Sequence, residues 1–361
     1  MNTLSDRQWR LIMKIYKLKT SYKEFINALL KKRKEVVAPV NYKNTLLFRQ
    51  ITSADEIVEP GNYINTVRSA KEFMFPITEP IIEFSYKNKD IQLDDYAPEL
   101  KHRVIVGLRP CDAAAFPVLD DIFNYEYKDE FYNSRRTENI LVSVACENAD
   151  ESCFCTSVGI TPDSFQGSDL LLKKNAAGNF FAYTNSDKGE QLAGLLKDVL
   201  EEVIDLVDEN PVYKQVAEKM RTPLELDKIK EWLDKNFDNP AWDEYGARCL
   251  GCASCAFLCP TCHCFDIVDE MKYDKGLRRK NWDACQFPVF TMHASGHNPR
   301  DKQNKRYRQR VMHKFKYYND RFNKTLCTGC GRCIRSCPVN LDIYEVVRSL
   351  PLNPLPKEGD F

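Results

Sequence analysis

Apolar and polar positions in the first part of the chain alternate in ways that predict both helices and strands. Over residues 6–34, apolar side chains from Trp9 to Leu29 recur at helical spacing, which predicts one or two amphipathic helices. A short apolar run at 35–40, interrupted by Pro39, predicts a strand, and so does the run at 80–86.

Two nearly continuous apolar runs follow, and they are the clearest part of the pattern. The runs at 103–108 and 139–145 are typical of buried parallel strands. Between them, Asp112 is a candidate N-cap for a helix over 113–123. A strand, a helix and a second strand make a βαβ unit, so we predict an α/β domain over residues 1–190.

The formal charge of the chain is zero because segments of opposite charge cancel. The 361 residues include 52 Lys and Arg and 52 Asp and Glu. Residues 190–244 hold 15 acidic and 7 basic residues, whereas 272–316 hold 13 basic and 3 acidic ones. Leucine and valine at helical spacing predict an acidic helical connection over 191–240, followed by a separate α-helical domain over 241–350. The proline-rich end, 351–361, is predicted to be a loose tail.

Cysteine is the outlier in the composition, with 15 residues, most of them in the last third of the chain. The odd count and the two- and three-residue spacings argue against a secreted disulfide scaffold and favour an intracellular metal protein. No apolar run reaches the about 18 residues that a membrane span needs, and no signal-peptide core is visible. We therefore expect a cytoplasmic protein without a membrane span.

Two C-x2-C-x2-C-x3-C-P runs predict two 4Fe–4S clusters. In runs of this type, three cysteines bind one cluster and the fourth binds the other cluster. One cluster is accordingly assigned to Cys249, Cys252, Cys255 and Cys337. The other is assigned to Cys327, Cys330, Cys333 and Cys259. Pro260 and Pro338 suit the first turn of a helix that begins at each fourth cysteine.

Two other kinds of metal site share part of this pattern. Zinc knuckles use C-x2-C pairs in closed tetrahedral sites, without a third evenly spaced cysteine and a fourth before proline. A radical-initiating C-x3-C-x2-C motif over Cys255, Cys259 and Cys262 overlaps the first run, and no barrel is predicted around it. The long segment between Cys259 and Cys327 favours a charged, largely helical insert, as in α-helical ferredoxins.

A third 4Fe–4S cluster is predicted where the two apolar strands of the βαβ unit end. Cys111 follows the first strand and Cys146 follows the second. Parallel neighbouring strands about 5 Å apart would bring both thiols to one edge of the sheet. Cys153 and Cys155 lie just after Cys146 and complete a set of four. The alternative is a group of buried or reactive thiols without a metal.

Three cysteines belong to neither group. Cys262, Cys264 and Cys285, with His263 and His297 nearby in sequence, are predicted to line the cluster pocket, because small sulfur groups pack well there. The alternative is that these side chains bind a metal ion of their own.

The basic segment at 272–316 has several possible roles. One role is the solvated face of a helix, a second is neutralisation of the clusters, and a third is docking of an acidic partner subunit. The main cations of the segment are Arg278, Arg279, Lys280, Arg300, Arg306, Arg308 and Arg310. Nucleic-acid binding is a fourth role open to this segment, but because the total charge is zero we expect no nucleic-acid partner. Neither G-x-G-x-x-G after a strand nor G-x-x-x-x-G-K-S/T is present, so we expect no flavin or nucleotide on this chain.

Several longer motifs also carry a family resemblance; they lie at 69–72, 107–112, 146–155, 259–266, 282–285, 296–298 and 308–315. On these motifs the chain resembles the iron–sulfur β subunit of cytosolic sulfhydrogenases (group 3 nickel–iron hydrogenases) and the related A subunit of anaerobic sulfite reductases. The resemblance implies an electron-transfer subunit beside an FAD- and NAD(P)-binding iron–sulfur subunit. It also implies a catalytic partner of the nickel–iron hydrogenase or sirohaem reductase type, and leaves open which.

The sequence thus predicts a multidomain α+β protein that transfers single electrons as part of an oxidoreductase complex. Such a subunit needs no substrate site of its own. The alternative is an iron–sulfur enzyme that itself reduces a small sulfur or disulfide substrate at Cys262, Cys264 and Cys285. A cluster-based sensor is a third possibility.

Overall fold

The computed structural model describes residues 13–32, 35–88, 90–204, 207 and 210–350. The chain divides into two compact units, and each combines three separate stretches of sequence. The first unit comprises Met1–Ala70, Leu100–Pro117 and Ser134–Arg221, and the second comprises Lys71–Glu99, Val118–Asn133 and Thr222–Phe361. The domains predicted from the sequence, with boundaries near residues 190 and 240, are each one continuous stretch. The observed units instead combine separate stretches. The predicted tail at 351–361 and the start of the N-terminal helical prediction lie outside the described residues.

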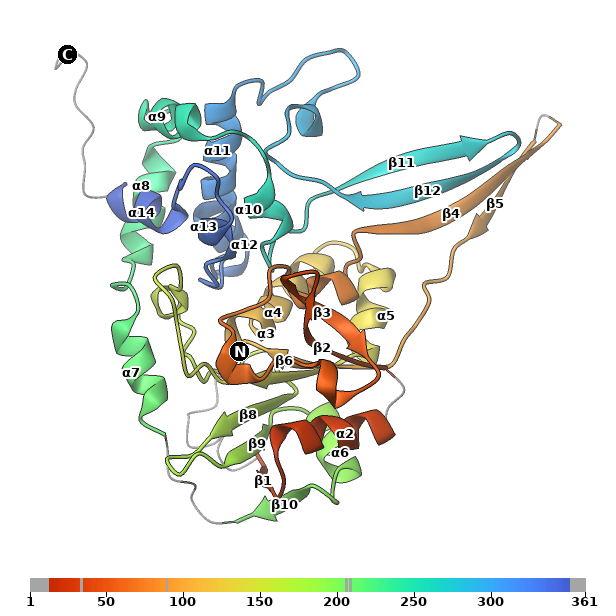
Figure 1. The fold of residues 1–361 in the computed structure, drawn as a ribbon. Helices are drawn as coiled ribbons and strands as arrows, with labels where there is room; N and C mark the ends of the chain where they lie inside the picture. Colours follow the sequence, from red (N-terminus) through yellow and green to blue (C-terminus); the bar gives the residue numbers. More distant parts are fainter. Residues whose placement is uncertain (1–12, 33–34, 89, 205–206, 208–209, 351–361) are drawn as a thin grey trace. The chain divides into compact units, whose positions relative to one another are not determined.

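An eight-stranded mixed sheet forms the centre of the first unit (Figure 1). Its strands, in spatial order, are β10 (Leu200–Val203), β1 (Ile15–Leu18), β9 (Phe180–Thr184), β8 (Leu170–Lys174), β7 (Ile140–Val144), β6 (Arg103–Leu108), β2 (Glu35–Tyr42) and β3 (Thr45–Ile51). The strands β2, β6, β7 and β8 run parallel, and the outer pairs are antiparallel. The predicted parallel pairing of the two apolar runs is confirmed, because β6 and β7 are neighbours.

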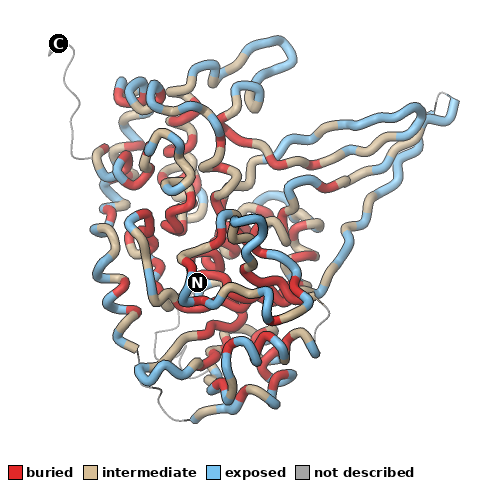
Figure 2. Tube along the Cα trace, viewed as in Figure 1, coloured by how far each residue is buried: buried red, intermediate tan, exposed pale blue. Residues whose placement is uncertain are grey.

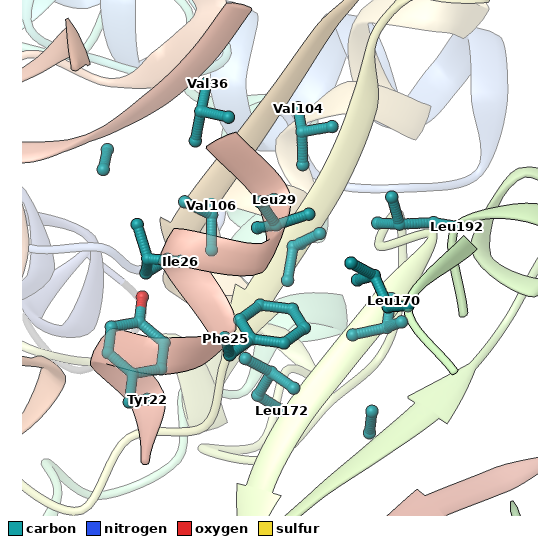
Figure 3. Close-up of a cluster of buried hydrophobic side chains, with 14 of the residues drawn as sticks. Tyr22, Phe25, Ile26, Leu29, Val36, Val104, Val106, Leu170, Leu172 and Leu192 are labelled. Atoms are coloured by element: carbon teal, nitrogen blue, oxygen red, sulfur yellow. The ribbon is translucent and has the colours of Figure 1, made fainter. Parts of the chain in front are cut away.

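Two helices, α2 (Tyr22–Lys32) and α6 (Asp187–Leu195), contribute side chains to the main core of this unit. Phe25, Ile26 and Leu29 of α2 are fully buried in it, together with Val104 and Val106 of β6 (Figure 3). Burying a side chain of this size stabilises a fold by about 1.5–3 kcal/mol relative to leaving it exposed. The apolar side chains at helical spacing in α2 therefore form the face of the helix that packs into the core.

Two predicted features near the N-terminus differ from the structure. Tyr16 belongs to strand β1 and not to a helix, because a segment of four residues is too short for its period to identify its conformation. The predicted strand at 35–40 is confirmed, but β2 continues through Pro39 to Tyr42. Only Glu35 to Val37 of β2 pair with β6, so the missing N–H of Pro39 removes no hydrogen bond from that pairing.

The helix after β6 begins earlier than predicted. Arg109 is its N-cap and Pro110 its first residue, so the N-cap assignment of Asp112 is wrong. Proline suits the first helical position because it lacks an N–H that would be unpaired there in any case. The segment then forms α3 (Pro110–Ala113) and α4 (Ala115–Phe123), with α5 (Glu130–Glu138) before β7.

Replacing Gly107 with Ala is expected to lower the free energy of unfolding by about 2–4 kcal/mol, from backbone strain and overpacking together. Gly107 has a φ of +83°, and an added Cβ would lie 2.8 Å from Pro39 Cδ and 2.9 Å from Tyr63 Oη. Gly159 is a matched control, because its φ is +79° and a Cβ there meets nothing within 4 Å. Urea titration of both variants checks the difference, and equal losses would contradict it.

The second unit contains a four-stranded antiparallel sheet, in the order β11 (Phe265–Lys272), β12 (Lys275–Trp282), β4 (Thr78–Lys87) and β5 (Asp90–Asp95). Pairing of β12 with β4 joins segments from the first and last thirds of the chain (Figure 1). The predicted strand at 80–86 is confirmed as part of β4. The prediction of a largely helical insert is wrong for 265–282. β11 is almost entirely exposed and β12 is largely half-buried (Figure 2), and no apolar period marked these strands in the sequence.

Helices form most of the remainder of the second unit: α8 (Leu226–Lys235), α9 (Ala241–Arg248), α10 (Ser254–Phe257), α11 (Gln303–Met312), α12 (Tyr318–Phe322), α13 (Arg332–Arg335) and α14 (Ile343–Ser349). The predicted helical connection is right for α7 (Val212–Lys219) and α8, but Leu200–Val203 is the edge strand β10. Among the helices that the structure describes, none has the length and apolar character needed to cross a membrane.

Candidate metal centres

The two cysteine runs fold in the same way, as a tight loop that leads into a single helical turn. Gly251 (φ +67°) and Ala253 (φ +61°) precede α10, and Gly329 (φ +61°) and Gly331 (φ +75°) precede α13. Alternation through left-handed conformations turns successive backbone N–H groups toward one side of a loop, where they favour an anion. The sequence repeat is therefore also a structural repeat.

The fourth cysteine of each run follows this helical turn. Cys259 comes after α10 and Cys337 comes after α13, and Pro260 and Pro338 each lie in a turn. The prediction that these cysteines begin a helix is wrong. Proline cannot continue a helix and is common just beyond its end.

One cavity of the second unit is lined by the four cysteines that the sequence assigns to the first cluster, namely Cys249, Cys252, Cys255 and Cys337. Tyr307, Arg310 and Cys333 also line it. The arrangement thus brings the last cysteine of the second run to the first three of the other run.

Cysteines of the second assigned set affect one another's pKa electrostatically. Burial raises the pKa of Cys333, and the charges of Cys330, Cys259 and Cys327 raise it further. Burial also raises the pKa of Cys327 to about 11, with contributions from Cys259 and Cys330. Because like charges influence a pKa strongly only when they are close, the four thiols share one region of the unit.

Lys314 is a buried cation beside these thiols. It lies in a π-helical turn, η6 (His313–Tyr317), and is only 2% exposed. Its Nζ donates hydrogen bonds to Cys259 Sγ at 3.2 Å, Thr261 Oγ1 at 3.3 Å and Leu326 O at 2.9 Å. Burial opposes the charge of Lys314, but the thiolates of Cys259 and Cys262 outweigh burial and raise its pKa.

Arg310 is a second buried cation among the cysteines. It is 3% exposed, and its Nη1 lies 3.9 Å from Cys262 Sγ. Burial opposes its charge, but the thiolates of Cys255 and Cys333 contribute to raising its pKa well above the usual range. Within the part of the chain that the structure describes, neither Arg310 nor Lys314 forms an ion pair with a carboxylate.

Several buried polar atoms in this region lack a hydrogen-bond partner among the described residues; they are Arg310 Nη2, Tyr307 Oη, Thr328 Oγ1 and Ser336 Oγ. Tyr307 and Arg310 of this set line the cavity. A buried polar group without a partner costs free energy, so these unpaired atoms call for a polar or charged occupant. Eight cysteines, two buried cations and these unpaired atoms fit anionic 4Fe–4S clusters.

The third set of cysteines lies in the first unit. Cys111 is in α3 directly after β6, and Cys146 follows β7, so both come after the carboxyl ends of parallel neighbours. Cys153 and Cys155 are buried, and Cys155 begins a short 3-10 turn, η4 (Cys155–Val158). Burial raises the pKa of Cys155, and nearby Cys146 and Cys153 raise it further.

Arg109 is the buried cation associated with this third set. It is 4% exposed, and its guanidinium donates to the backbone carbonyls of Ile64 at 2.8 Å and Pro60 at 2.6 Å, and also to Tyr63 O. Burial opposes its charge, but the charges of Tyr63, Cys146 and Cys111 together raise its pKa. The third set thus repeats the combination of thiols and a buried cation seen in the second unit.

The remaining cysteines and histidines do not form one cluster. Interaction with Cys259 raises the pKa of Cys262, whereas interaction with Cys285 raises the pKa of Cys264. Interaction with Cys264 lowers the pKa of Cys285 to about 6. His263 packs against the ring of His313, with 5.3 Å between centroids, and burial lowers its pKa to about 4.

His297 lies elsewhere, in an exposed loop. Its ring faces that of His293, with 5.4 Å between centroids. Among the described residues, no group of three or more His, Cys, Asp or Glu side chains is arranged to hold a single metal ion, so the alternative of a separate metal ion bound by Cys262, Cys264 and Cys285 has no support.

The basic segment divides into parts with different environments. Arg278 and Arg279 form cross-strand ion pairs with Asp269 and Glu270 on the exposed hairpin. Lys280 is buried, with Nζ 2.9 Å from Glu79 and 2.8 Å from Asp129. Only the part from Arg306 to Lys314 supplies buried charge near the cysteines.

The sequence interpretation missed Lys314 and Lys71 as individual residues. Lys71 is 3% exposed, donates to Cys262 O at 2.7 Å and lies over the Trp282 ring at 4.0 Å. The available signal was the apolar context of each lysine, since buried lysine is rare unless it is paired.

Residues 248–341 match the family model of a 4Fe-4S dicluster domain. The chain is 29% identical over 339 residues to the sulfhydrogenase 2 subunit beta of Pyrococcus furiosus, and the match covers 93% of this chain and 98% of that protein. No solved structure matches the chain. The resemblance to a sulfhydrogenase iron–sulfur β subunit is confirmed, whereas the resemblance to a sulfite reductase subunit stays a prediction.

Proposed function

We propose that this chain, which carries a 4Fe–4S dicluster domain and is related to a sulfhydrogenase β subunit, is the iron–sulfur electron-transfer subunit of a multisubunit oxidoreductase. It relays single electrons between an FAD- and NAD(P)-binding iron–sulfur subunit and a catalytic subunit of the nickel–iron hydrogenase or sulfite/sulfur reductase type. The observation that carries the proposal is the presence of two cysteine runs together with buried cations that pair with no carboxylate among the described residues.

The cavity lining supports the crossed assignment of ligands to the first cluster, Cys249, Cys252, Cys255 and Cys337. The mutual electrostatic effects among Cys259, Cys327, Cys330 and Cys333 support the second. When bound, the clusters supply one-electron oxidation and reduction.

The chain's own residues would set how readily each cluster takes an electron. The thiolates hold the iron, and Lys314 and Arg310 offset their negative charge in a region where little water screens it. Hydrogen bonds to ligand sulfurs, such as that from Gln303 Nε2 to Cys249 Sγ at 3.2 Å, also favour the reduced state.

Electron exchange with a partner needs a route to the protein surface. Cys252 is an exposed cysteine, and the neighbouring Leu250 is 68% exposed. The loop of the first run therefore supports exchange between the first cluster and a docked subunit. Purification of a tagged chain under anaerobic conditions, followed by native mass spectrometry, tests the role. Recovery with a flavoprotein and a catalytic metal subunit is expected, whereas an isolated chain that reduces polysulfide or disulfide with a reduced dye would contradict it.

We further propose a third 4Fe–4S cluster at Cys111, Cys146, Cys153 and Cys155. It is supported by the position of these thiols after parallel strands and by the buried charge of Arg109. Clusters commonly take four cysteine ligands, and this set supplies them within one unit.

Replacing Cys153 and Cys155 together with Ser is expected to lower the iron content by about four atoms per chain, because half of the ligand set is removed. The conservative change Thr156→Ser in the same loop is the matched control and should leave iron unchanged. Iron and protein are quantified on the same anaerobic sample. An unchanged iron content in the double variant would refute the third cluster.

A further inference from the structure

Cys264 and Cys285 meet at the open end of the β11–β12 hairpin. The last residue pair of the hairpin is Phe265 with Trp282, and Asp283 N donates to Cys264 O at 3.0 Å just beyond it. The strand pairing thus holds the two segments together at the position of the cysteines. Although an entire hairpin separates them in sequence, the fold makes these cysteines neighbours.

Because both cysteines lie just beyond the paired residues Phe265 and Trp282, their side chains are at the same end of the hairpin. Each thiol there affects the other, so that the pKa of Cys264 is raised and that of Cys285 is lowered. Cys285 is 8% exposed, and Ala284 beside it is fully buried against Ala253 and Ala256 of the first cysteine run. Tight packing therefore fixes the pair in place, and neither cysteine belongs to a ligand set proposed above.

A single amide side chain connects this pair to the first cluster. Gln286 Nε2 donates to Cys285 Sγ at 3.6 Å, and Gln286 Oε1 lies 3.7 Å from Cys249 Sγ. Gln303 Nε2 bridges the same two groups, at 2.9 Å from Gln286 Oε1 and 3.2 Å from Cys249 Sγ. The pair is thus within electron-transfer reach of a proposed cluster ligand.

We propose that Cys264 and Cys285 are a redox-active dithiol/disulfide pair that exchanges electrons with the cluster at Cys249. The inference rests on the proposed function, because the clusters are its source and sink of electrons. On oxidation, each thiol loses one proton and one electron and a single S–S bond forms; the two protons go to water and the two electrons pass one at a time to the cluster. Reduction reverses every step.

Such a pair would give the subunit a two-electron store beside its one-electron carriers. Flavin, hydride and dihydrogen chemistry moves electrons in pairs, whereas a 4Fe–4S cluster moves them singly. A dithiol next to the first cluster can hold the second electron of a pair until the cluster is free. Low exposure of Cys285 slows its exchange with external thiols without preventing equilibration, so the cluster is its faster redox partner.

The pair can be detected by peptide mass spectrometry, without measuring activity. The protein is equilibrated anaerobically in buffers of reduced and oxidised dithiothreitol, quenched in acid, alkylated and digested with trypsin. Cys264 then lies in peptide 249–272 and Cys285 is the only cysteine of peptide 281–300. We expect these peptides to be cross-linked, with the disulfide-to-dithiol ratio changing tenfold for each step of about 30 mV, as a two-electron couple requires.

Variants identify which cysteine of peptide 249–272 is involved. The cross-link should disappear in Cys264→Ser and persist in Cys262→Ser, the matched control two residues away. Absence of the cross-link in the wild-type protein at every potential would overturn the proposal. So would its persistence in Cys264→Ser.

Two further readouts separate this inference from the proposed function. Iron content should be unchanged in Cys264→Ser and Cys285→Ser; a loss of about four irons would make them cluster ligands and overturn the dithiol. After oxidation, the wild-type chain should accept two more electrons from reduced methyl viologen than Cys285→Ser does, and equal uptake would overturn the coupling to the cluster. A wild-type chain without iron would instead refute the proposed function, while the cross-link could still be scored.

Discussion

Replacing Cys337 with Ser is expected to remove the cluster held by the first cysteine run and to leave the cluster of its own run in place. The cavity lined by Cys337 contains Cys249, Cys252 and Cys255, so the loss of any one of the four opens the same ligand set. Each single variant should lose about four iron atoms per chain.

Double variants distinguish the crossed assignment from one cluster per run. If Cys337 and Cys252 share a cluster, the variant carrying both substitutions loses no more iron than either single variant. If Cys337 and Cys330 serve different clusters, their double variant loses about eight irons, because effects at independent sites add.

Iron analysis, with electron paramagnetic resonance of the reduced proteins, measures these losses. Cys259→Ser is the reciprocal test, because it should remove the cluster of the second run. An additive loss for Cys337 with Cys252, and a non-additive loss for Cys337 with Cys330, would refute the crossing and assign each run its own cluster.

Replacing Lys314 with Met is expected to make the cluster bound by Cys259 harder to reduce. The Lys314 ammonium lies 3.2 Å from Cys259 Sγ and is buried, so its charge stabilises added negative charge on that cluster. A unit charge several ångströms away, at an effective dielectric constant of about 20, contributes about 2–3 kcal/mol. For one electron this corresponds to a fall of about 100 mV in the reduction potential.

Lys316→Met is the matched control, because Lys316 lies in the same turn but pairs with Asp234 and Asp320, each at 2.7 Å, and not with a cysteine. Its loss should leave the potential nearly unchanged. Both variants are compared by a redox titration followed by electron paramagnetic resonance. Equal potentials for wild type and Lys314→Met would show that Lys314 serves packing alone.

Local features of the sequence predicted the strands β2, β6 and β7 of the first unit, but not β1, β3, β8, β9 or β10. The runs at 103–108 and 139–145 predicted β6 and β7 and their parallel pairing, because a strand buried on both faces must be apolar throughout. The helix start was misplaced at Asp112 because the preference of proline for the first helical position outweighed the capping preference of aspartate.

These local rules could not predict pairing between segments that are distant in the sequence. The β11–β12 hairpin pairs with β4 from the first third of the chain, and its polar strands carry charges that pair across the hairpin instead of an apolar stripe. A polar exposed strand gives no periodic burial signal, so this part of the insert was predicted as helix.

The sequence by itself determined the chemistry of the cysteine runs, because cluster ligation imposes a short, local spacing that survives in one dimension. Tertiary structure decided which cations serve that chemistry. Lys314 and Arg310 are the same residue types as the solvated lysines and arginines near them in the sequence. Only their burial beside thiolates distinguishes them. It also decided the contact of Cys264 with Cys285, since a hairpin must close before these two sulfurs meet.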